Sequence, residues 1–305
     1  MSAGAAARSW FASDADYGEE WDEADWADEG WDEAGSGEGP FDDALTDGAA
    51  PGAIAFGLLA TVPLLLLYEA SLAGLVPARR NVAEILLGWV LVPLGDHGGW
   101  VRIAVWLAVA CAAAAACLRA RIPIGPRLVR TLIEASAAAL VMGPAIVLLG
   151  RLFGDVAPRL ALDEWYPATS PSLAQVGFVA GGAAYEEVCF RFCAFSALFL
   201  LARALLTFFG LSLEPARFAA EVIGLLGSSL LFAAAHLKAF TDLLGLEGWG
   251  SLEAFDARLF FWRVLAAVIL YALFRWRGLG VAAWAHALFN AGLALGVGPA
   301  VLQTP

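Results

Sequence analysis

Residues 177–201 read GFVAGGAAYEEVCFRFCAFSALFLL, an apolar run in which the only charged side chains are Glu186, Glu187 and Arg191. A hydrophobic run of this length is typical of a helix that crosses a bilayer. Each ionised side chain at a bilayer centre costs about 2.5–3.5 kcal/mol on insertion scales, and such residues usually mark a pathway, a proton relay or a reaction site. The run therefore predicts a membrane helix that contains a functional site.

The rest of the chain has the composition of a polytopic membrane protein. Hydrophobic residues make up 60% of the sequence, charged residues make up 16%, and the mean hydropathy is +0.72. Apolar segments lie at 53–76, 82–95, 100–118, 128–150, 172–205, 217–237, 257–276 and 280–298. Most of them are long enough, at roughly 20 residues, to cross a hydrocarbon core of about 30 Å. We therefore predict an all-α fold, a polytopic transmembrane helical bundle of about eight segments.

Segment 82–95 is shorter than the others and contains Glu84, so it either crosses the membrane or re-enters it. If it crosses, most arginines outside the tail fall on one face, which the positive-inside rule assigns to the cytoplasm. The N-terminal tail then lies outside the cytoplasm. If the segment re-enters, the tail lies in the cytoplasm instead.

The net charge of −12 comes from the N-terminal tail. Residues 1–47 contain fifteen Asp and Glu and one Arg, which gives −14 and leaves +2 for the remainder. High net charge with few aliphatic side chains predicts a disordered acidic tail over residues 1–50, followed by a membrane domain over 51–305. The tail repeats the Trp-containing motif WDEA at 21–24 and 31–34. A solvated extension is the simpler interpretation, and binding to a basic partner or to the membrane interface is the alternative.

Two of the three histidines lie in apolar segments at helical spacing from other candidate groups. His236 ends the motif FAAAH, which begins at Phe232, and His286 begins the motif HALFN, which ends at Asn290. Residues four apart share a helix face, so each pair can point into one cavity. A single buried histidine is commonly explained by a hydrogen bond to a neighbouring helix. Two of them together with a glutamate pair favour a site.

The two adjacent glutamates are predicted to have different roles. Consecutive positions on an α-helix lie about 100° apart, so Glu186 and Glu187 face different directions. Glu187 and Arg191 have the i, i+4 spacing of a favourable ion pair, which neutralises both charges in lipid. We therefore predict that Glu187 and Arg191 support the site and that Glu186 takes part in the chemistry.

A carboxylate, two imidazoles and a carboxamide can together hydrolyse a peptide bond with water as the nucleophile. Glu186 with His236 would deprotonate the water and return the proton to the leaving amine. His286 and Asn290 would donate hydrogen bonds to the tetrahedral oxyanion. The sequence has no G-x-S-x-G elbow, so a direct attack by water is the simpler hypothesis.

The motifs that carry these residues resemble those of a known family. EEVCFR, FAAAH and HALFN match the signatures EExxxR, FxxxH and HxxxN of the CPBP intramembrane proteases, which include the type II CAAX prenyl endopeptidases. The resemblance covers about residues 172–298. It implies an eight-helix membrane core and a protease domain over 51–305. It also implies that Glu186 and His236 activate water and that His286 and Asn290 stabilise the oxyanion. The acidic tail is not part of the family pattern.

Metal dependence stays open at the level of sequence. Glu186, His236 and His286 could supply three ligands to a zinc ion, with water as the fourth. A glutamate that binds zinc could not also act freely as the base, so we favour a mechanism without a metal. The expected cofactor is therefore none, with a divalent zinc ion as the alternative.

The substrate and the cellular setting are predicted only in outline. The resemblance implies a membrane-embedded or lipidated peptide substrate, and no nucleic-acid partner is expected. One lysine against seventeen arginines, with abundant alanine, indicates a GC-rich bacterial genome and hence a multi-pass protein of the bacterial plasma membrane. Prenylated proteins are not expected there, which favours peptide or membrane-protein processing, including bacteriocin maturation or self-immunity. The alternatives are a non-catalytic membrane scaffold or immunity protein of the same fold and, less favoured, a proton-coupled transporter.

Overall fold

The computed structural model describes residues 51–74, 81–88, 91, 94–95, 97–152, 172–245 and 253–295. All of them lie in one compact unit, Gly39–Pro305. The second unit, Met1–Glu38, and the rest of the acidic tail predicted for residues 1–50 lie outside the described residues.

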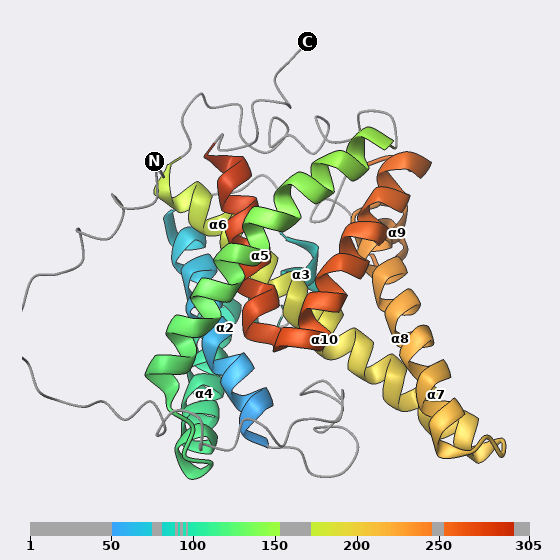
Figure 1. Ribbon diagram of the computed structural model, residues 1–305. Coiled ribbons are helices and arrows are strands. Elements are labelled where there is room, and N and C mark those ends of the chain that lie inside the picture. Colours follow the sequence, from blue (N-terminus) through green and yellow to red (C-terminus); the bar gives the residue numbers. More distant parts are fainter. Residues whose placement is uncertain are drawn as a thin grey trace, which may run out of the picture. The chain divides into compact units, whose positions relative to one another are not determined.

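The described part of the chain is a bundle of helices (Figure 1). Its elements in order are α2 (Pro51–Gly74), α3 (Val82–Gly88), α4 (Gly98–Arg119), α5 (Ile124–Leu152), α6 (Leu173–Glu186), the π-helix η5 (Glu187–Phe195), α7 (Ser196–Phe208), α8 (Leu213–Ala235), α9 (Lys238–Leu243) and α10 (Ala257–Ala294). The predicted all-helical class is confirmed. Within these residues, β pairing is limited to one isolated bridge between Leu237 and Glu253.

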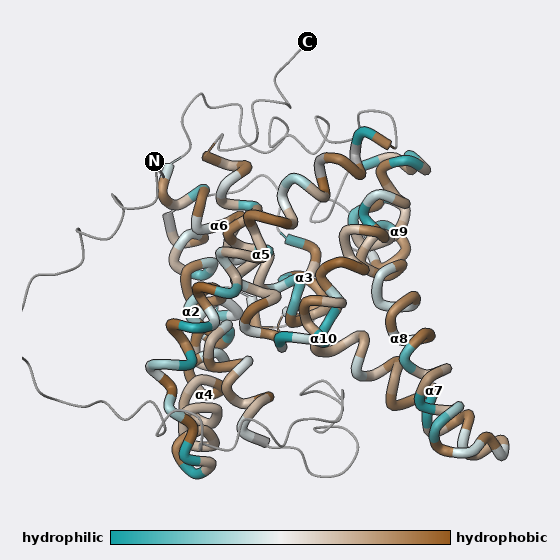
Figure 2. The backbone as a smooth tube through the Cα atoms, in the orientation of Figure 1, coloured by the Kyte–Doolittle hydropathy of each residue, from teal (hydrophilic) through white to brown (hydrophobic). Residues whose placement is uncertain are grey.

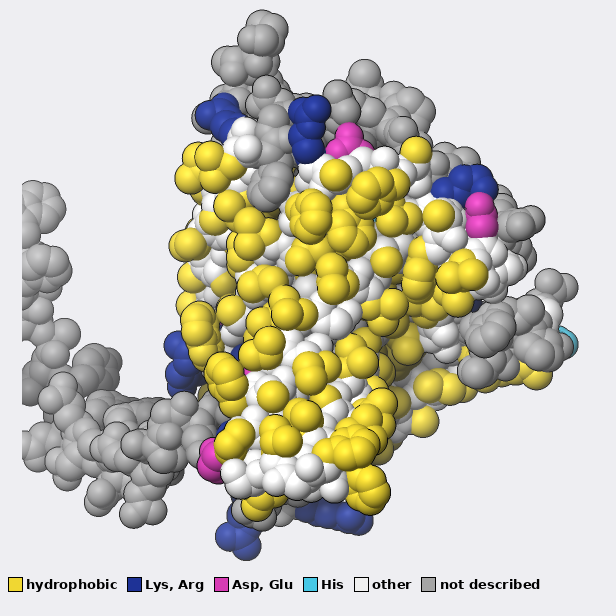
Figure 3. Space-filling view, turned by 90° about the vertical axis from the view of Figure 1, so that its right-hand side faces the viewer, with side chains coloured by type: hydrophobic (Ala, Val, Ile, Leu, Met, Phe, Trp, Pro, Cys, Tyr) yellow, Lys and Arg dark blue, Asp and Glu magenta, His cyan; other side chains and the backbone are white. Residues whose placement is uncertain are grey.

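Six helical stretches of the described chain are long and apolar enough to cross a membrane (Figure 2). They are Gly52–Ala73, Gly98–Arg119, Ile124–Ile146, Leu173–Phe208, Leu213–Ala235 and Ala257–Ala294. Large apolar side chains on their outer surfaces are exposed, among them Phe208 at 80% and Phe218 at 73%. Figure 3 shows hydrophobic side chains over most of one face, with charged side chains gathered towards its margins. This surface is suited to lipid, and the protein is a membrane protein.

Helix α10 (Ala257–Ala294) covers the predicted segment 257–276 and residues 280–294 of the predicted segment 280–298, and these two parts meet at a sharp bend. Gly278 has φ 83° and ψ 174°, a backbone conformation that only glycine adopts readily. Figure 1 shows the two limbs of α10 as the arms of a V. The bend brings the second limb, which carries His286, back into the bundle beside α2 and α6.

The predicted segment 82–95 is described only in part. Its described helix, α3, has seven residues, which corresponds to a length of about 10 Å at 1.5 Å per residue. This helix is too short to cross a membrane by itself, and it packs against α6 and η5 instead. Glu84, the charge that marked this segment as unusual, is 1% exposed and forms a 2.6 Å ion pair with Arg102 of α4.

Helices α2 and α6 approach each other closely because α6 presents two glycines four residues apart. A Cβ atom on Gly177 would lie 2.4 Å from Ser71 Oγ. A Cβ atom on Gly181 would lie 2.7 Å from the carbonyl oxygen of Leu64 and 2.5 Å from Tyr68 Cβ. Small residues at this spacing allow the backbones of membrane helices to come together. The contact fixes the C-terminal half of α6, which ends at Glu186.

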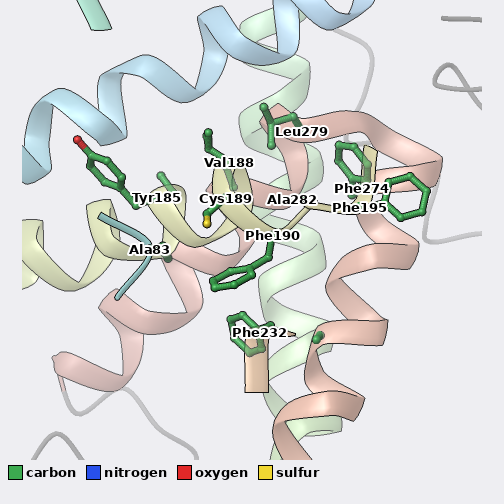
Figure 4. Packing of buried hydrophobic residues seen from close by; sticks show 14 of the residues in the cluster. Ala83, Tyr185, Val188, Cys189, Phe190, Phe195, Phe232, Phe274, Leu279 and Ala282 are labelled. Atoms are coloured by element: carbon green, nitrogen blue, oxygen red, sulfur yellow. The ribbon is translucent and has the colours of Figure 1, made fainter. Parts of the chain in front are cut away.

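The chain continues from Glu186 into a π-helix, where the prediction assumed an unbroken α-helix. Residues 187–195 have the wider i→i+5 winding, which occurs frequently at functional sites. Aromatic side chains anchor this segment to its neighbours. Phe190 meets Phe232 of α8 at 5.4 Å between ring centroids (Figure 4). Phe195 meets Tyr271 of α10 at 5.0 Å between ring centroids.

We expect Gly181→Ala to destabilise the protein, because the added methyl group meets backbone atoms that cannot move independently. Overpacking of this kind costs about 1–3 kcal/mol. Thermal unfolding in detergent micelles would measure the effect. Gly292→Ala is the matched control, since a Cβ atom there meets nothing within 4 Å. Equal unfolding midpoints for the two variants would contradict the close α2–α6 contact.

Candidate active site

The candidate site is centred on Glu186, the last residue of α6, a buried residue that is 9% exposed. Its two carboxylate oxygens face two histidines from different helices. Oε1 lies 4.0 Å from Nε2 of His236, and Oε2 lies 3.7 Å from Nε2 of His286. Residues 50 and 100 positions away in sequence therefore converge on one carboxylate.

His236 is held at the end of α8 by the preceding turn of its own helix. It is the C-terminal capping residue, and its Nδ1 lies 2.8 Å from the carbonyl oxygen of Phe232. A carbonyl oxygen only accepts hydrogen bonds, so Nδ1 carries the proton and donates it. In the neutral imidazole, Nε2 then has a free lone pair directed to the side of Glu186. The FAAAH motif thus fixes the tautomer of its histidine, and the Phe232 ring packs edge-on against it at 4.9 Å.

Glu187 is fully buried and contacts two partners with one oxygen. Its Oε1 lies 2.8 Å from Nδ1 of His286 and 3.3 Å from Nη1 of Arg191. The Arg191 guanidinium also lies over the Phe232 ring, 4.5 Å from its centroid, a geometry that favours a cation–π contact. Arg191 therefore connects the EExxxR motif to the FxxxH motif.

The two glutamates share a partner that the helical geometry did not predict. They were expected to face different directions, but they contact opposite nitrogens of the same imidazole: Glu187 at Nδ1 and Glu186 at Nε2 of His286. The bend in α10 makes this possible, because it inserts His286 between the two carboxylates. The sequence gives no indication of this shared contact.

Asn290 lies one helical turn after His286 and is half-buried. Within the described part of the chain, its side chain makes no hydrogen bond to another residue. Its predicted role at the oxyanion stays a prediction.

Asn81 is a contact of Glu186 that the sequence did not reveal. Its Nδ2 donates a 2.8 Å hydrogen bond to Oε1 of Glu186, across 105 positions of sequence. Asn81 lies outside the three motifs, directly before α3, and asparagine at a helix start is commonly no more than a cap. The sequence therefore carries no signal that would single it out.

The same residues can be tested for their fit to a metal ion. Glu186, His236 and His286 are of the types that bind zinc. Two ligands about 2.1 Å from one zinc ion lie about 3.4 Å apart at the tetrahedral angle. The Glu186 oxygens lie 3.7 and 4.0 Å from the Nε2 atoms of His286 and His236, close to this spacing, so the three residues could hold a zinc ion. The mechanism without a metal stays a prediction, and we assign no step to a metal.

Fold and site together define an all-helical membrane protein with a buried carboxylate–histidine centre. Residues 168–292 match the family model described as type II CAAX prenyl endopeptidase, Rce1-like. The match confirms the resemblance stated from the three motifs, all of which lie inside it. The matched family is a protease family and supports a protease. No curated protein and no solved structure matches the chain.

We expect Arg191→Met to destabilise the fold, because it leaves the Glu187 charge buried without its guanidinium partner. Breaking a buried ion pair in this way costs about 3–5 kcal/mol. The double variant Glu187→Gln, Arg191→Met should recover part of the loss, since a glutamine oxygen still accepts a hydrogen bond from His286. Denaturant unfolding in detergent would measure the free energies.

The exposed pair between Lys238 and Asp242 on α9 supplies the control. Lys238→Met is expected to change the unfolding free energy by less than about 1 kcal/mol. A loss in Arg191→Met no larger than that in Lys238→Met would show that the buried pair does not support the fold.

Proposed function

We propose that this protein is an intramembrane endopeptidase in which Glu186 and His236 activate a water molecule for attack on a peptide bond. The position of the Glu186 carboxylate between the Nε2 atoms of His236 and His286, at 4.0 and 3.7 Å, carries the proposal. These distances exceed a hydrogen bond and lie within the reach of a water molecule that contacts both groups. The match to a protease family supports the same reaction.

Water activation uses the tautomer that the FAAAH motif fixes. Because Nδ1 of His236 donates to the Phe232 carbonyl, Nε2 is available as an acceptor beside the Glu186 carboxylate. As the water oxygen bonds to the carbonyl carbon of the substrate, Glu186 with His236 takes the proton of the water. The electron pair of the carbonyl bond moves onto its oxygen. When the tetrahedral intermediate collapses, the C–N bond breaks and the same proton passes to the leaving amine.

Stabilisation of the oxyanion places a further requirement on His286. Its Nδ1–H donates to Glu187, so Nε2 can donate to an oxyanion only when the imidazole carries protons on both nitrogens. Asn290 adds a second donor one turn further along α10 in this proposal.

We infer the substrate class from the setting of the site. The chemistry lies among membrane helices, so a membrane-associated or lipidated peptide or protein is the substrate that reaches it most directly. We propose processing of such a substrate in a bacterial plasma membrane, on the basis of the arginine-rich, lysine-poor composition. A basic partner or membrane target of the acidic tail stays a separate prediction.

Replacement of the base tests the mechanism. We expect Glu186→Gln to lower kcat by about 10²- to 10⁴-fold towards a quenched fluorescent lipopeptide, because it removes general-base catalysis while keeping the size of the side chain. Glu134→Gln, at the surface pair with Arg130 on α5, is the control and should retain wild-type activity. Equal cleavage by Glu186→Gln and wild type would contradict the proposed mechanism. If the wild-type protein cleaves none of a panel of lipidated and membrane peptides, the non-catalytic scaffold is favoured.

The metal-free mechanism is tested by the zinc content of the purified protein. We expect less than stoichiometric zinc in wild type and no difference in His236→Ala, measured by elemental analysis after removal of loosely bound ions. Stoichiometric zinc in wild type that is lost in the variant would overturn the assignment of Glu186 as a free base.

A further inference from the structure

We propose that Asn81 is a positioning residue that holds the Glu186 carboxylate in its reactive orientation. The inference rests on the proposed function for its kinetic part only. Asn81 lies outside residues 168–292, the segment that matches the protease family, so the site depends on a part of the chain that the family match does not include.

The orientation of the Asn81 amide is determined by its two contacts. The backbone N–H of Ala83 donates a 2.9 Å hydrogen bond to Oδ1 of Asn81. The N–H can only donate, so this end of the amide is the oxygen, and the NH₂ group must lie at the other end. That group points to Oε1 of Glu186 at 2.8 Å. A hydrogen bond to an ionised carboxylate is stronger than one between neutral groups, and it defines the plane of the carboxylate.

Asn81 itself is anchored to α2 and α4 through a buried polar network. Its backbone N–H donates to the hydroxyl of Tyr68 at 3.3 Å, and the same hydroxyl donates to Oε2 of Glu84 at 3.5 Å. Glu84 is paired in turn with Arg102 of α4 at 2.6 Å, and Arg102 also binds both oxygens of Glu69 of α2 at 3.0 Å. The contact to Glu186 therefore extends from a fixed framework.

The surface of α6 is shaped to receive the amide. A Cβ atom added to Gly182 would lie 3.0 Å from Nδ2 of Asn81, closer than most real Cβ contacts. The absence of a side chain at Gly182 leaves the space in which the NH₂ group reaches Glu186, one turn further along the same helix. Ala83, two residues after Asn81, and Tyr185, the neighbour of Glu186, belong to one cluster of buried hydrophobic residues (Figure 4).

The two carboxylate oxygens of Glu186 therefore have different partners. Oε1 accepts the hydrogen bond from Asn81, and Oε2 is directed to His286. Without the amide, the carboxylate can rotate about χ3, the last side-chain torsion, whose distribution is broad in glutamate. Misplacement of a reacting group by about 1 Å costs on the order of 10²-fold in rate.

Two substitutions separate the positioning role from helix capping. Asn81→Ser keeps a good capping oxygen for α3 but loses the NH₂ group, whereas Asn81→Ala loses both. If Asn81 positions Glu186, both variants lower kcat towards the quenched lipopeptide by about 10- to 100-fold with KM changed less than about twofold. Wild-type kcat in Asn81→Ser with a loss only in Asn81→Ala would reduce Asn81 to a cap and overturn the proposal.

Gly182→Ala approaches the same contact from the other side. The added methyl group displaces the Asn81 amide without changing its chemistry, and kcat should fall while KM is maintained. Gly292→Ala is the control, because its Cβ atom meets no neighbour. Unchanged kcat in Gly182→Ala, with Asn81→Ser impaired, would argue against the direct contact.

A double-mutant cycle tests the contact without any substrate. Asn81→Ser should lower the thermal unfolding midpoint by about 1–2 °C in wild type, as expected for one hydrogen bond in a membrane protein of this size, and by less than half as much in a Glu186→Ala background. Additive shifts would overturn the proposal. If the cycle shows coupling while no peptide is cleaved, the proposed function fails, but the positioning of Glu186 by the Asn81 hydrogen bond is supported.

Discussion

The hydrogen bond between Glu187 and His286 is the interaction on which the arrangement of the site depends. It joins the π-helix after α6 to the second limb of α10, two segments separated by 99 positions in sequence. A fully buried carboxylate needs partners, because its desolvation costs several kcal/mol without them. Glu187 obtains them from His286 and Arg191, and in doing so it places the far nitrogen of the imidazole 3.7 Å from Glu186.

Two backbone features allow that bond to form. At Gly278 the chain turns sharply, so that the second limb of α10 returns through the bundle and does not continue away from it. At Gly177 and Gly181 the backbone of α6 lies against α2, which sets the depth of Glu186 and Glu187 in the core. A side chain at Gly181 would displace α6, which carries Glu186 and leads directly to Glu187 in η5. The charged centre thus depends on glycines that take no part in its chemistry.

The sequence predicted the helical class and the main candidates for the site because both follow from local patterns. Apolar runs of about 20 residues identify membrane helices, and Glu186, His236 and His286 are conspicuous as rare polar groups within them. It did not predict Asn81, because a capping asparagine is common and its target lies 105 residues away. It did not predict the π-helix either, since that winding is rare and depends on packing against neighbours. Segment 82–95 looked like a weak span because its charge, Glu84, is balanced by a tertiary partner that composition cannot reveal.

The two histidines differ in a way that their similar spacing concealed, and the difference supports the opposite chemical roles that we propose for them. His236 donates Nδ1–H to a neutral carbonyl, which fixes a tautomer without favouring a positive charge, so its Nε2 is suited to accept a proton. His286 donates Nδ1–H to a carboxylate, which can balance the charge of a doubly protonated ring, so its Nε2 is suited to donate. A base and an oxyanion donor need these opposite properties on the two sides of one carboxylate. The distinction comes from the atom that each Nδ1 contacts, and it holds whether the peptide that enters the site is lipidated or not.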